Sequence, residues 1–452
     1  MRKFLLFLII SSFSSSSFSQ EVELAPIKIE KDYWQKFMEV QDYIYREEIP
    51  LFSLEEMIDY SSSIDLKKRS IFGIQQDISL RGSIFEDVSV KLAGVKINDP
   101  QTGHFNLEIP LTSADIEEIE IHKNAQTINF NLLPPKDKGA FCKISFGQHA
   151  LWEKLISLNF LLGESKNRVS FEHKISSGYR QDTDFEIYNF SFHSLWEEED
   201  KEVEFLFGST KRDFGAGNFY TTLFPHQEEH ITQRFFYLRT KIPRDFLKLN
   251  NILYLRRHTD KFILDRHNPA FYTNYHTTYI YGFNTKFDFT RSIFLDLDIR
   301  REEIDSTNLG KHHRLNMGCR LGVEKKRIGN FIFDFQGGVN YYEDWEYLEE
   351  VQLNLGYFLK ENLKLGFSCA RVWRTPSFTE LYYFSPANVG NPDLEIQKSN
   401  NFEVGLESIF EDIIFSGKSF LRSQSHTIDW VRNSLEDPWQ AENIGDLQIW
   451  GV

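Results

Sequence analysis

The sequence has 452 residues, enough for two or three average domains or for one large barrel. Aromatic residues make up 15% of the chain, 26% of the residues are charged and the net charge is −15. This acidic balance argues against a nucleic-acid-binding protein, which normally carries a basic patch. The three cysteines are far apart and odd in number, so they form neither a zinc-binding spacing nor a closed disulfide framework.

Residues 1–19 have the pattern of a secretory signal peptide. Arg2 and Lys3 precede the apolar run 4–10, and Ser17-Phe18-Ser19 supplies small residues before a predicted cut at Gln20. No other stretch approaches the roughly 20 apolar residues that a helical membrane span needs. We therefore expect an exported protein without membrane-spanning helices: a periplasmic protein, a secreted protein or an outer-membrane barrel.

Residues 20–52 are predicted to be an N-terminal segment made of a short peptide and a linker. Residues 23–30 are short, β-prone and flanked by polar residues, as is typical of peptides that a partner captures as an added strand. A disordered tail is a compatible alternative. Residues 31–50 are interpreted as an aromatic and charged linker. Ser53 and Glu56 then have the spacing of a capping box, which predicts a short helix to about Tyr60.

Residues 78–121 predict a small mixed α/β unit with a polar loop at its tip. Its expected parts are strands at 78–80 and 88–92, a turn at Ala93-Gly94, a polar loop at 98–106, an acidic segment at 113–118 and a strand at 119–121. Pro134-Pro135 and a run of charges mark its end. We assign residues 53–138 to this domain.

From Gly139 onward, apolar and polar residues alternate in strand-like rows. Apolar rows include Val169, Phe171 and Ile175; Val203, Phe205 and Phe207; Leu295, Leu297 and Ile299; Phe331, Phe333 and Phe335; and Phe402, Val404 and Leu406. A soluble sandwich also alternates, but its outer row does not need so many large aromatic residues. In lipid, a closed sheet satisfies every backbone group and places the apolar row outward. Residues 139–452 therefore predict an antiparallel transmembrane β-barrel.

The predicted connections differ in length, as they do in outer-membrane barrels. Residues 163–167 form a short connection, whereas 212–227, 259–278 and 380–400 are long and polar.

Several motifs in these regions are those of one family. They are Leu80-Arg81-Gly82, Leu92-Ala93-Gly94-Val95, the run from Asn98 to His104, residues 116–121, Asp213-Phe214-Gly215-Ala216, residues 374–383 and Gly390-Asn391-Pro392-Asp393-Leu394. In these motifs the sequence resembles TonB-dependent outer-membrane receptors, and among them the vitamin B12 receptor-like branch. The resemblance implies a plug domain inside a barrel of about 22 strands. Ala93 stands where the family usually has Asn or Asp.

The resemblance implies an active transporter of the bacterial outer membrane, and not an enzyme. The implied ligand is large and scarce, with cobalamin or a related corrinoid first and an iron siderophore or haem second. The implied partners are a periplasmic TonB-type energy-coupling protein, membrane lipid and the barrel-assembly machinery, with no nucleic acid. The peptide that the coupling protein would grip is Leu24, Ala25, Pro26, Ile27, Lys28 and Ile29. The alternatives are a surface-binding barrel that does not transport and a secreted β-sandwich hydrolase.

In this family the plug loops at 67–77 and 98–106 face outward and touch ligand. The implied ligand-binding residues are Phe72, Gln75, Asn98, Gln101, Thr102, His104 and Asn106. Pro100 and Gly103 fix a tight turn in the second loop, and its polar side chains offer donors and acceptors. A loop that only braces the barrel wall is equally compatible with this pattern. Arg81, Gly82 and Gly94 are interpreted as structural, and Arg81 is expected to need a carboxylate partner from the wall.

No catalytic motif is present: the sequence has neither a nucleotide-binding fingerprint nor a Gly-x-Ser-x-Gly elbow. His258, His267 and His276 are interpreted as solvated histidines of one long loop region, so no cofactor or transition-metal site is predicted. Asp182 and Asp184 could hold a structural calcium ion, as paired loop carboxylates do. A solvated turn is the alternative.

The last ten residues, 443–452, read as an internal strand of the family. At about 20 residues per strand and loop, 139–452 predicts about 15 or 16 strands. We therefore expect a truncated chain that ends on an open sheet edge near Val452 and that does not transport by itself.

Overall fold

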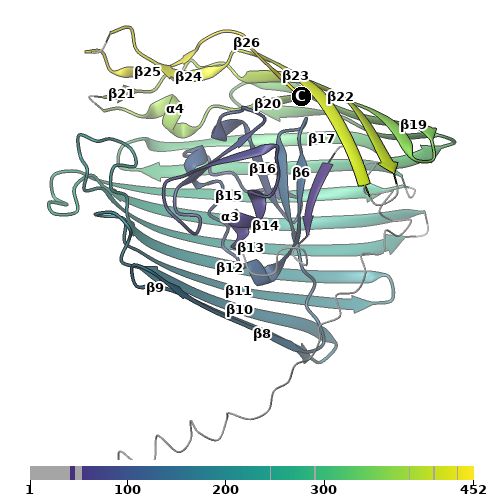
Figure 1. The fold of residues 1–452 in the computed structure, drawn as a ribbon, viewed down its shortest axis with the longest axis horizontal. Helices are drawn as coiled ribbons and strands as arrows, with labels where there is room; N and C mark the ends of the chain where they lie inside the picture. Colours follow the sequence, from purple (N-terminus) through teal and green to yellow (C-terminus); the bar gives the residue numbers. More distant parts are fainter. Residues whose placement is uncertain are drawn as a thin grey trace, which may run out of the picture. The chain divides into compact units, whose positions relative to one another are not determined.

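A curved antiparallel sheet forms the wall of the molecule. The structure is a computed structural model that describes residues 41–45, 53–244, 246–289, 292–385, 387–410, 413–434 and 436–452. Within this part of the chain the wall has 16 strands, which pair in sequence order from β8 to β20 and continue through β22, β23 and β26. β8 and β26 therefore lie at the two ends of the sheet (Figure 1). The expected strand number and the expected open edge near Val452 are confirmed for the described residues.

The wall strands are long, and successive ones run antiparallel. Their bounds are β8 (Gly139–Gly147), β9 (Leu151–Leu162), β10 (Ser165–Ser176), β11 (Phe185–Glu198), β12 (Lys201–Gly215), β13 (Glu228–Arg244), β14 (Leu247–Ile263), β15 (Thr273–Asp288), β16 (Ile293–Ser306), β17 (Gly310–Ile328), β18 (Phe331–Tyr342), β19 (Glu346–Lys360), β20 (Leu363–Arg374), β22 (Gln397–Phe410), β23 (Ile413–Ser425) and β26 (Leu447–Gly451).

The wall is apolar on its outer face and polar on the face toward the plug. In β22, Phe402, Val404 and Leu406 are 44%, 52% and 48% exposed, whereas the intervening Glu403 is 4% exposed. A soluble sheet shows the reverse pattern, because its apolar row faces the core. The alternation identified in the sequence is therefore that of a barrel wall, and the expected fold class is confirmed.

The connections are short at one end of the wall and long at the other. Residues 163–164 join β9 to β10 at the short-turn end, whereas 177–184, 216–227, 264–272, 375–396 and 426–446 lie at the long-loop end. The two longest of these connections, 375–396 and 426–446, contain α4 (Phe378–Tyr382) and a three-stranded sheet of β21 (Asn388–Val389), β24 (Ile428–Val431) and β25 (Trp439–Asn443).

The prediction of a long loop at 259–278 is wrong. β14 continues to Ile263 and β15 begins at Thr273, so only nine residues connect them. His258 and His276 lie within these strands and are buried, so they are not solvated loop histidines. The polar character of this stretch comes from side chains that face the interior of the wall.

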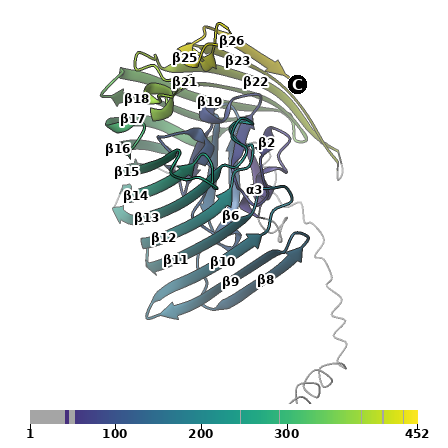
Figure 2. The same cartoon turned by 90° about the vertical axis from the view of Figure 1, so that its left-hand side faces the viewer.

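The plug lies within the curve of the wall (Figures 1 and 2). Its elements are β1 (Gln41–Tyr45), α3 (Leu54–Ile58), β2 (Ile64–Lys68), β3 (Gln76–Leu80), β4 (Ser89–Leu92), β5 (Val95–Lys96), β6 (Ile116–His122), β7 (Thr127–Leu132) and the short 3₁₀ turns Phe85–Asp87, Gly103–Phe105 and Ser113–Asp115. Five of these strands form a mixed sheet in the order β1-β6-β7-β4-β5, in which β4 and β7 are parallel.

Local signals in the sequence account for several plug elements. Ser53 and Glu56 make the predicted capping box at the start of α3. Ala93 and Gly94 form a two-residue hairpin turn with positive φ at both positions, a conformation that Asn or Asp adopts more easily than Ala. Within the segment interpreted as a linker, Gln41–Tyr45 forms β1, which pairs with β6 and buries Ile44 in the plug core.

The apolar core of the plug continues into one side of the wall. Plug residues such as Ile78, Val90 and Ile119 belong to the same buried cluster as wall residues from β12 to β15. The wall members of this cluster are Leu206, Phe235, Tyr237, Ile252, Tyr254 and Ile280. Gly208 of β12 lies against the backbone of Pro110, so the plug and the wall approach closely here. The plug is therefore attached to β12–β15 by apolar packing.

A buried carboxylate, Asp115, joins the plug to β10 and β11. Its oxygens accept hydrogen bonds from the Thr112 backbone and hydroxyl, from Arg168 at 3.0 Å, and from the Ser170 and Ser191 hydroxyls. Burial raises the pKa of Asp115, but Arg168 and these hydrogen bonds outweigh burial and hold that pKa below its usual value. The carboxylate is therefore charged and fully partnered.

We predict that Asp115→Ala loosens the plug. The change leaves the buried Arg168 guanidinium without its carboxylate, which costs about 3–5 kcal/mol. The measurement is denaturant unfolding of the purified protein together with protease accessibility of the plug. Glu117→Ala, two residues away and exposed, is the control. Equal stability of the two variants would contradict the prediction.

Candidate functional site

The loop at 98–106 is fixed by hydrogen bonds within the plug. The Asn98 side chain accepts from the Val90 backbone N–H at 2.7 Å and donates to the Val88 carbonyl at 2.8 Å. The Asn106 side chain accepts from the Asp99 backbone N–H at 3.1 Å. Asn98 and Asn106 therefore use their amide groups to hold the two ends of the loop.

The same loop is bound to the wall through a buried ion pair. Asp99 lies 2.6 Å from the Arg256 guanidinium of β14 and accepts a hydrogen bond from Thr278 of β15. Burial raises the pKa of Asp99, but Arg256, followed by His258, outweighs it and lowers that pKa. The Gln101 side chain reaches Asp260 of β14 at 3.4 Å. The loop is thus anchored on two neighbouring wall strands.

The helix α4 covers the loop from the long-loop end. The backbone N–H groups of Phe378 and Thr379 donate to the carbonyls of Pro100 and Gln101 at 2.8 and 3.1 Å. Arg374 forms a bidentate ion pair with Glu380 in this helix and also contacts Asp87 of the plug at 3.1 Å. The connection 375–396 is therefore joined directly to the plug tip.

The second predicted loop, between β2 and β3, meets the first through His104. The His104 ring lies 2.6 Å from Asp77 and stacks on Phe85, and Asp77 also pairs with Arg69 at 2.9 Å. Gln75 is buried and donates to Glu229 of β13 at 3.1 Å. The two loops and the wall thus form one continuous polar network.

The network shows where the predicted ligand-binding residues lie. Gln75, Gln101 and Asn106 are buried, while Phe72, Asn98, Thr102 and His104 are partly buried. Phe72, with a positive φ, packs against Phe185 and lies under the Lys174 ammonium group. These contacts are those of a bracing loop. A ligand-binding role for the seven residues stays a prediction.

Arg81, Gly82 and Gly94 lie in turns of the plug, and their structural role stays a prediction. Arg81 pairs with Glu403 of β22, a carboxylate from the wall. Arg81 and Gly82 both have positive φ, and the adjacent Leu80 carbonyl accepts from Arg422 of β23 at 2.9 Å. Gly94 lies at the exposed tip of the β4–β5 hairpin.

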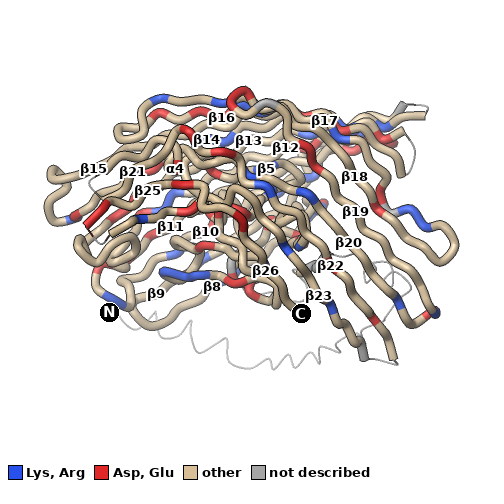
Figure 3. The backbone as a smooth tube through the Cα atoms, turned by 90° about the horizontal axis from the view of Figure 1, so that it is seen from above, with Lys and Arg blue, Asp and Glu red and all other residues tan. Residues whose placement is uncertain are grey.

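A polar cavity separates the plug hairpin from the opposite side of the wall. It has a volume of about 360 Å³ and lies between β4–β7 and the inner faces of β14–β20. Its charged lining comprises Lys91, Lys96, Glu120 and His122 of the plug and Asp298, Arg300, Arg320 and Glu350 of the wall. Positive and negative residues are interspersed on the wall and the plug (Figure 3). The plug is thus packed through apolar contacts on one side and faces a polar space on the other.

The cavity changes the ionisation of plug lysines. Burial, and then the Arg300 guanidinium, lower the pKa of Lys96 from about 10.5 to about 7. Burial, and then Arg320, also lower the pKa of Lys91. Lys96 therefore changes its charge near neutral pH.

Sequence reasoning missed this cavity and the wall arginines that line it. The signal was present in β16, where Asp296, Asp298 and Arg300 occupy alternate positions opposite an apolar row. The pattern predicts an inward-facing charged row, but the sequence does not show which plug residues face it.

At the long-loop end, Asp182 and Asp184 contact a cation of the protein itself. Arg266 binds Asp184 at 2.5 and 3.1 Å and reaches Asp182 at 3.3 Å. Arg266 thus binds the same two carboxylates that could hold a calcium ion. Calcium binding stays an untested prediction.

The peptide from Leu24 to Ile29 and the predicted signal at 1–19 lie outside the described residues.

We predict that Lys96→Met stabilises the protein most at neutral and lower pH. The unfolded chain holds this proton up to about pH 10.5, whereas the folded chain loses it near pH 7. Unfolded molecules therefore bind more protons across this window, and wild-type stability rises with pH through it. The difference in the free energy of unfolding between Lys96→Met and the wild type should therefore shrink between pH 7 and 10.

Denaturant midpoints at several pH values measure this effect. Lys67→Met, at an exposed plug lysine, is the control for the loss of one charge. A stability difference between Lys96→Met and the wild type that stays constant with pH would contradict the lowered pKa of Lys96.

None of the helices in the described part of the chain has the length and apolar character needed to cross a membrane.

Comparison with known proteins gives one weak sequence relative. It is the vitamin B12 transporter BtuB of Photobacterium profundum, 24% identical over 104 residues, which is 22% of this chain and 17% of that protein. The match thus spans less than a fifth of the length of this relative.

Solved structures match the fold over most of the chain. The siderophore receptor PirA of Pseudomonas aeruginosa is 14% identical, with a TM-score of 0.72 over 90% of this chain and 80% of that chain. PirA of Acinetobacter baumannii is 12% identical, with a TM-score of 0.74 over 94% and 79%. The FrpB iron transporter of Neisseria meningitidis is 12% identical, with a TM-score of 0.68 over 88% and 73%.

The decisive match is to a family model. The model described as TonB dependent receptor-like, beta-barrel, matches residues 157–452, more than half of the chain. This match covers the wall strands from within β9 to β26. Proteins of this family reside in the outer membrane of Gram-negative bacteria, and the chain belongs to this family of TonB-dependent receptor-like β-barrels.

Proposed function

We propose that the protein actively imports a large, scarce ligand across the outer membrane and is not an enzyme. The observation that carries this proposal is a plug held inside the wall by buried ion pairs. Asp99 pairs with Arg256, Asp115 with Arg168 and Arg81 with Glu403. Breaking one buried pair costs about 3–5 kcal/mol. A plug held by several such pairs opposes spontaneous opening, so passage needs an external source of work.

The proposed source of work is a TonB-type coupling protein that grips residues 24–29 as an added strand. β1 supports this route, because among the described strands it lies at the edge of the plug sheet, paired with β6. A pull on the segment before β1 acts first on the β1–β6 hydrogen bonds. Strands at a sheet edge separate at lower cost than central ones, since only one ladder is broken.

The proposed ligand is large and has apolar faces. The long-loop end exposes Tyr179, Tyr220, Leu223, Phe224, Phe271 and Phe384. Such a concentration of exposed apolar side chains on loops is typical of binding surfaces. Cobalamin or a related corrinoid is the first candidate, since the sequence relative is a vitamin B12 transporter. An iron siderophore or haem is the second, because two of the matched structures are siderophore receptors.

We predict that, in a receptor whose barrel is closed, deletion of residues 23–29 abolishes uptake and leaves surface binding intact. Binding uses the long-loop end, whereas the deleted peptide is the proposed handle for the coupling protein. Labelled cobalamin and a ferric siderophore, added to producing cells, measure both steps. An equally long deletion at 31–37 controls for chain length. Unchanged uptake would remove the coupled-transport proposal, and binding without uptake in the undeleted protein would favour the non-transporting barrel.

We predict that replacing Gln101, Thr102 and His104 together with Ala weakens cobalamin binding in a folded protein. Asn131→Ala is the control, because Asn131 lies in β7, outside the loop, where its side chain bonds to Asn129 and Glu118. Binding assays and heat-modifiable gel mobility are measured in parallel. Unchanged affinity with greater protease sensitivity of the plug would assign the loop to bracing.

A further inference from the structure

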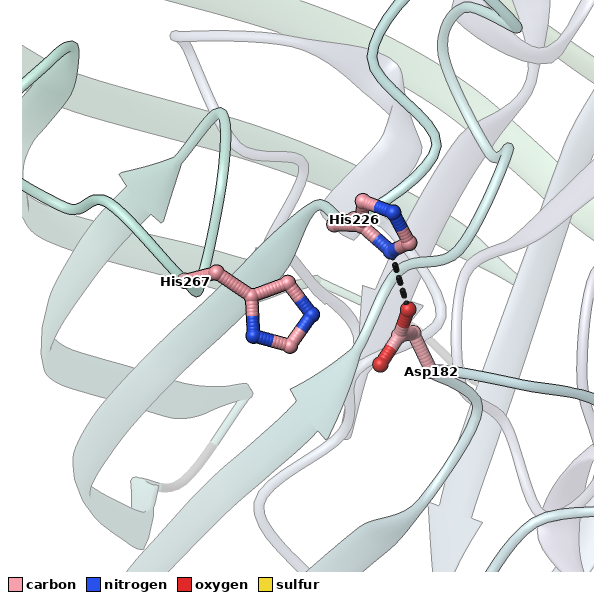
Figure 4. A group of neighbouring side chains, drawn as sticks. All are labelled: Asp182, His226 and His267. Carbon is pink, nitrogen blue, oxygen red and sulfur yellow. Dashed lines mark hydrogen bonds and ion pairs between the residues drawn. The ribbon is translucent and has the colours of Figure 1, made fainter.

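Three connections at the long-loop end bring a carboxylate and two imidazoles together outside the plug. Asp182 comes from the β10–β11 connection, His226 from β12–β13 and His267 from β14–β15 (Figure 4). One potential ligand atom of each residue lies within 4.8 Å of the other two. His226 Nδ1 is 2.5 Å from Asp182 Oδ2, and the two imidazole centroids are 4.9 Å apart.

The backbone positions two of these residues tightly. Asp182 has a positive φ, and its carbonyl accepts from the Gly217 backbone N–H at 2.8 Å. A Cβ at Gly217 would lie 2.9 Å from the same carbonyl oxygen, so this approach requires glycine. The His226 carbonyl accepts from the Arg266 N–H at 2.8 Å. The cluster is therefore built into the packing of three loops.

His267 is the adjustable member. Its backbone N–H donates to Asp265 Oδ1 at 2.9 Å, which fixes the turn, while its side chain is exposed. Its ring contacts the His226 ring edge to face. Rotation of this exposed side chain can bring its nitrogen closer to the other two ligand atoms without moving the backbone.

The charges around the cluster favour a cation. The Arg266 guanidinium is shared by Asp182, Asp184 and Glu228, so one positive group faces three carboxylates. Arg266 contacts Asp182 through Oδ1, whereas Oδ2 faces His226. One oxygen of Asp182 is thus directed toward the imidazoles while the other is held in place.

We propose that Asp182, His226 and His267 bind a divalent transition metal of the zinc class. Two imidazole nitrogens and one carboxylate oxygen are donors that such ions favour, whereas calcium and magnesium favour oxygen. Metal–ligand bonds of about 2.0–2.2 Å require the three atoms to close around the ion, and the His226–Asp182 hydrogen bond is replaced by bonds to the metal. The remaining coordination position is open to water or to a donor atom of a bound molecule.

The bound ion would cross-link three loops that are otherwise joined by hydrogen bonds and by Arg266. These loops stand above the polar network that contains Asp77 and His104, where Tyr220 of the middle loop lies beside the His104 ring. The site is independent of whether the protein transports a ligand, since it rests only on the geometry of the loops.

The test uses the full chain, refolded in detergent, and Zn²⁺ alone as the probe. Competition with a chromophoric chelator gives the stoichiometry and the affinity. We expect one Zn²⁺ site that is weakened about tenfold or more in Asp182→Asn, His226→Ala and His267→Ala. His426→Ala is the matched control, because His426 also faces a loop carboxylate, Glu395 at 3.3 Å, but belongs to no such cluster in the described residues.

His267→Ala separates metal binding from folding, because the His267 side chain is exposed and its removal leaves the fold intact. Unchanged Zn²⁺ affinity in this variant, or affinity lowered equally in His426→Ala, would overturn the proposal. A tenfold excess of Ca²⁺ should leave Zn²⁺ binding unchanged. Equal competition by Ca²⁺ would overturn the imidazole site in favour of an oxygen-ligand site.

Discussion

Every charged side chain that points inward from the wall needs a partner, and this constraint organises the molecule. The wall must be apolar outside, so its polar residues collect on the inner face. Water is largely displaced there by the plug, and a buried charge without a partner costs several kcal/mol. The plug supplies the matching groups: Asp99 for Arg256, Asp115 for Arg168 and Asp87 for Arg374. The position of the plug is therefore set by charge pairing as much as by apolar packing.

The two sides of the plug differ in how they meet the wall. Toward β12–β15, the plug core and wall residues such as Phe235 and Ile252 share one apolar cluster. Toward β16–β20, the β4–β5 hairpin faces a polar cavity. Separation on the first side would expose apolar surface, while movement on the second side would not. The second side is consequently the one where rearrangement costs less free energy.

Much of the fold could be predicted from the sequence, because a two-residue period survives in the wall strands regardless of their partners. The capping box at Ser53 and the turn at Ala93-Gly94 were local enough to be recognised as well. The error at 259–278 arose because inward-facing polar residues such as His258 and Asp260 have the composition of a loop. Composition cannot separate a polar loop from a strand whose polar row is buried against a second domain.

The candidate sites depended on contacts across long sequence separations, which no local pattern encodes. Asp99 and Arg256 are 157 residues apart, and Asp182 and His226 are 44 apart. The motif at 98–104 pointed to a loop of interest, but not to the wall groups that hold it. Likewise, no local pattern shows that His267 lies beside His226 of another loop.

The polar cavity has a consequence for how the plug could move. A space of about 360 Å³ lined by charged and amide side chains accommodates on the order of ten water molecules. Water there can exchange hydrogen bonds with Lys91, Glu120 and Arg320 one at a time, so that no group loses all its partners at once. Hydration on this side would therefore divide one large free-energy barrier to plug displacement into many smaller ones.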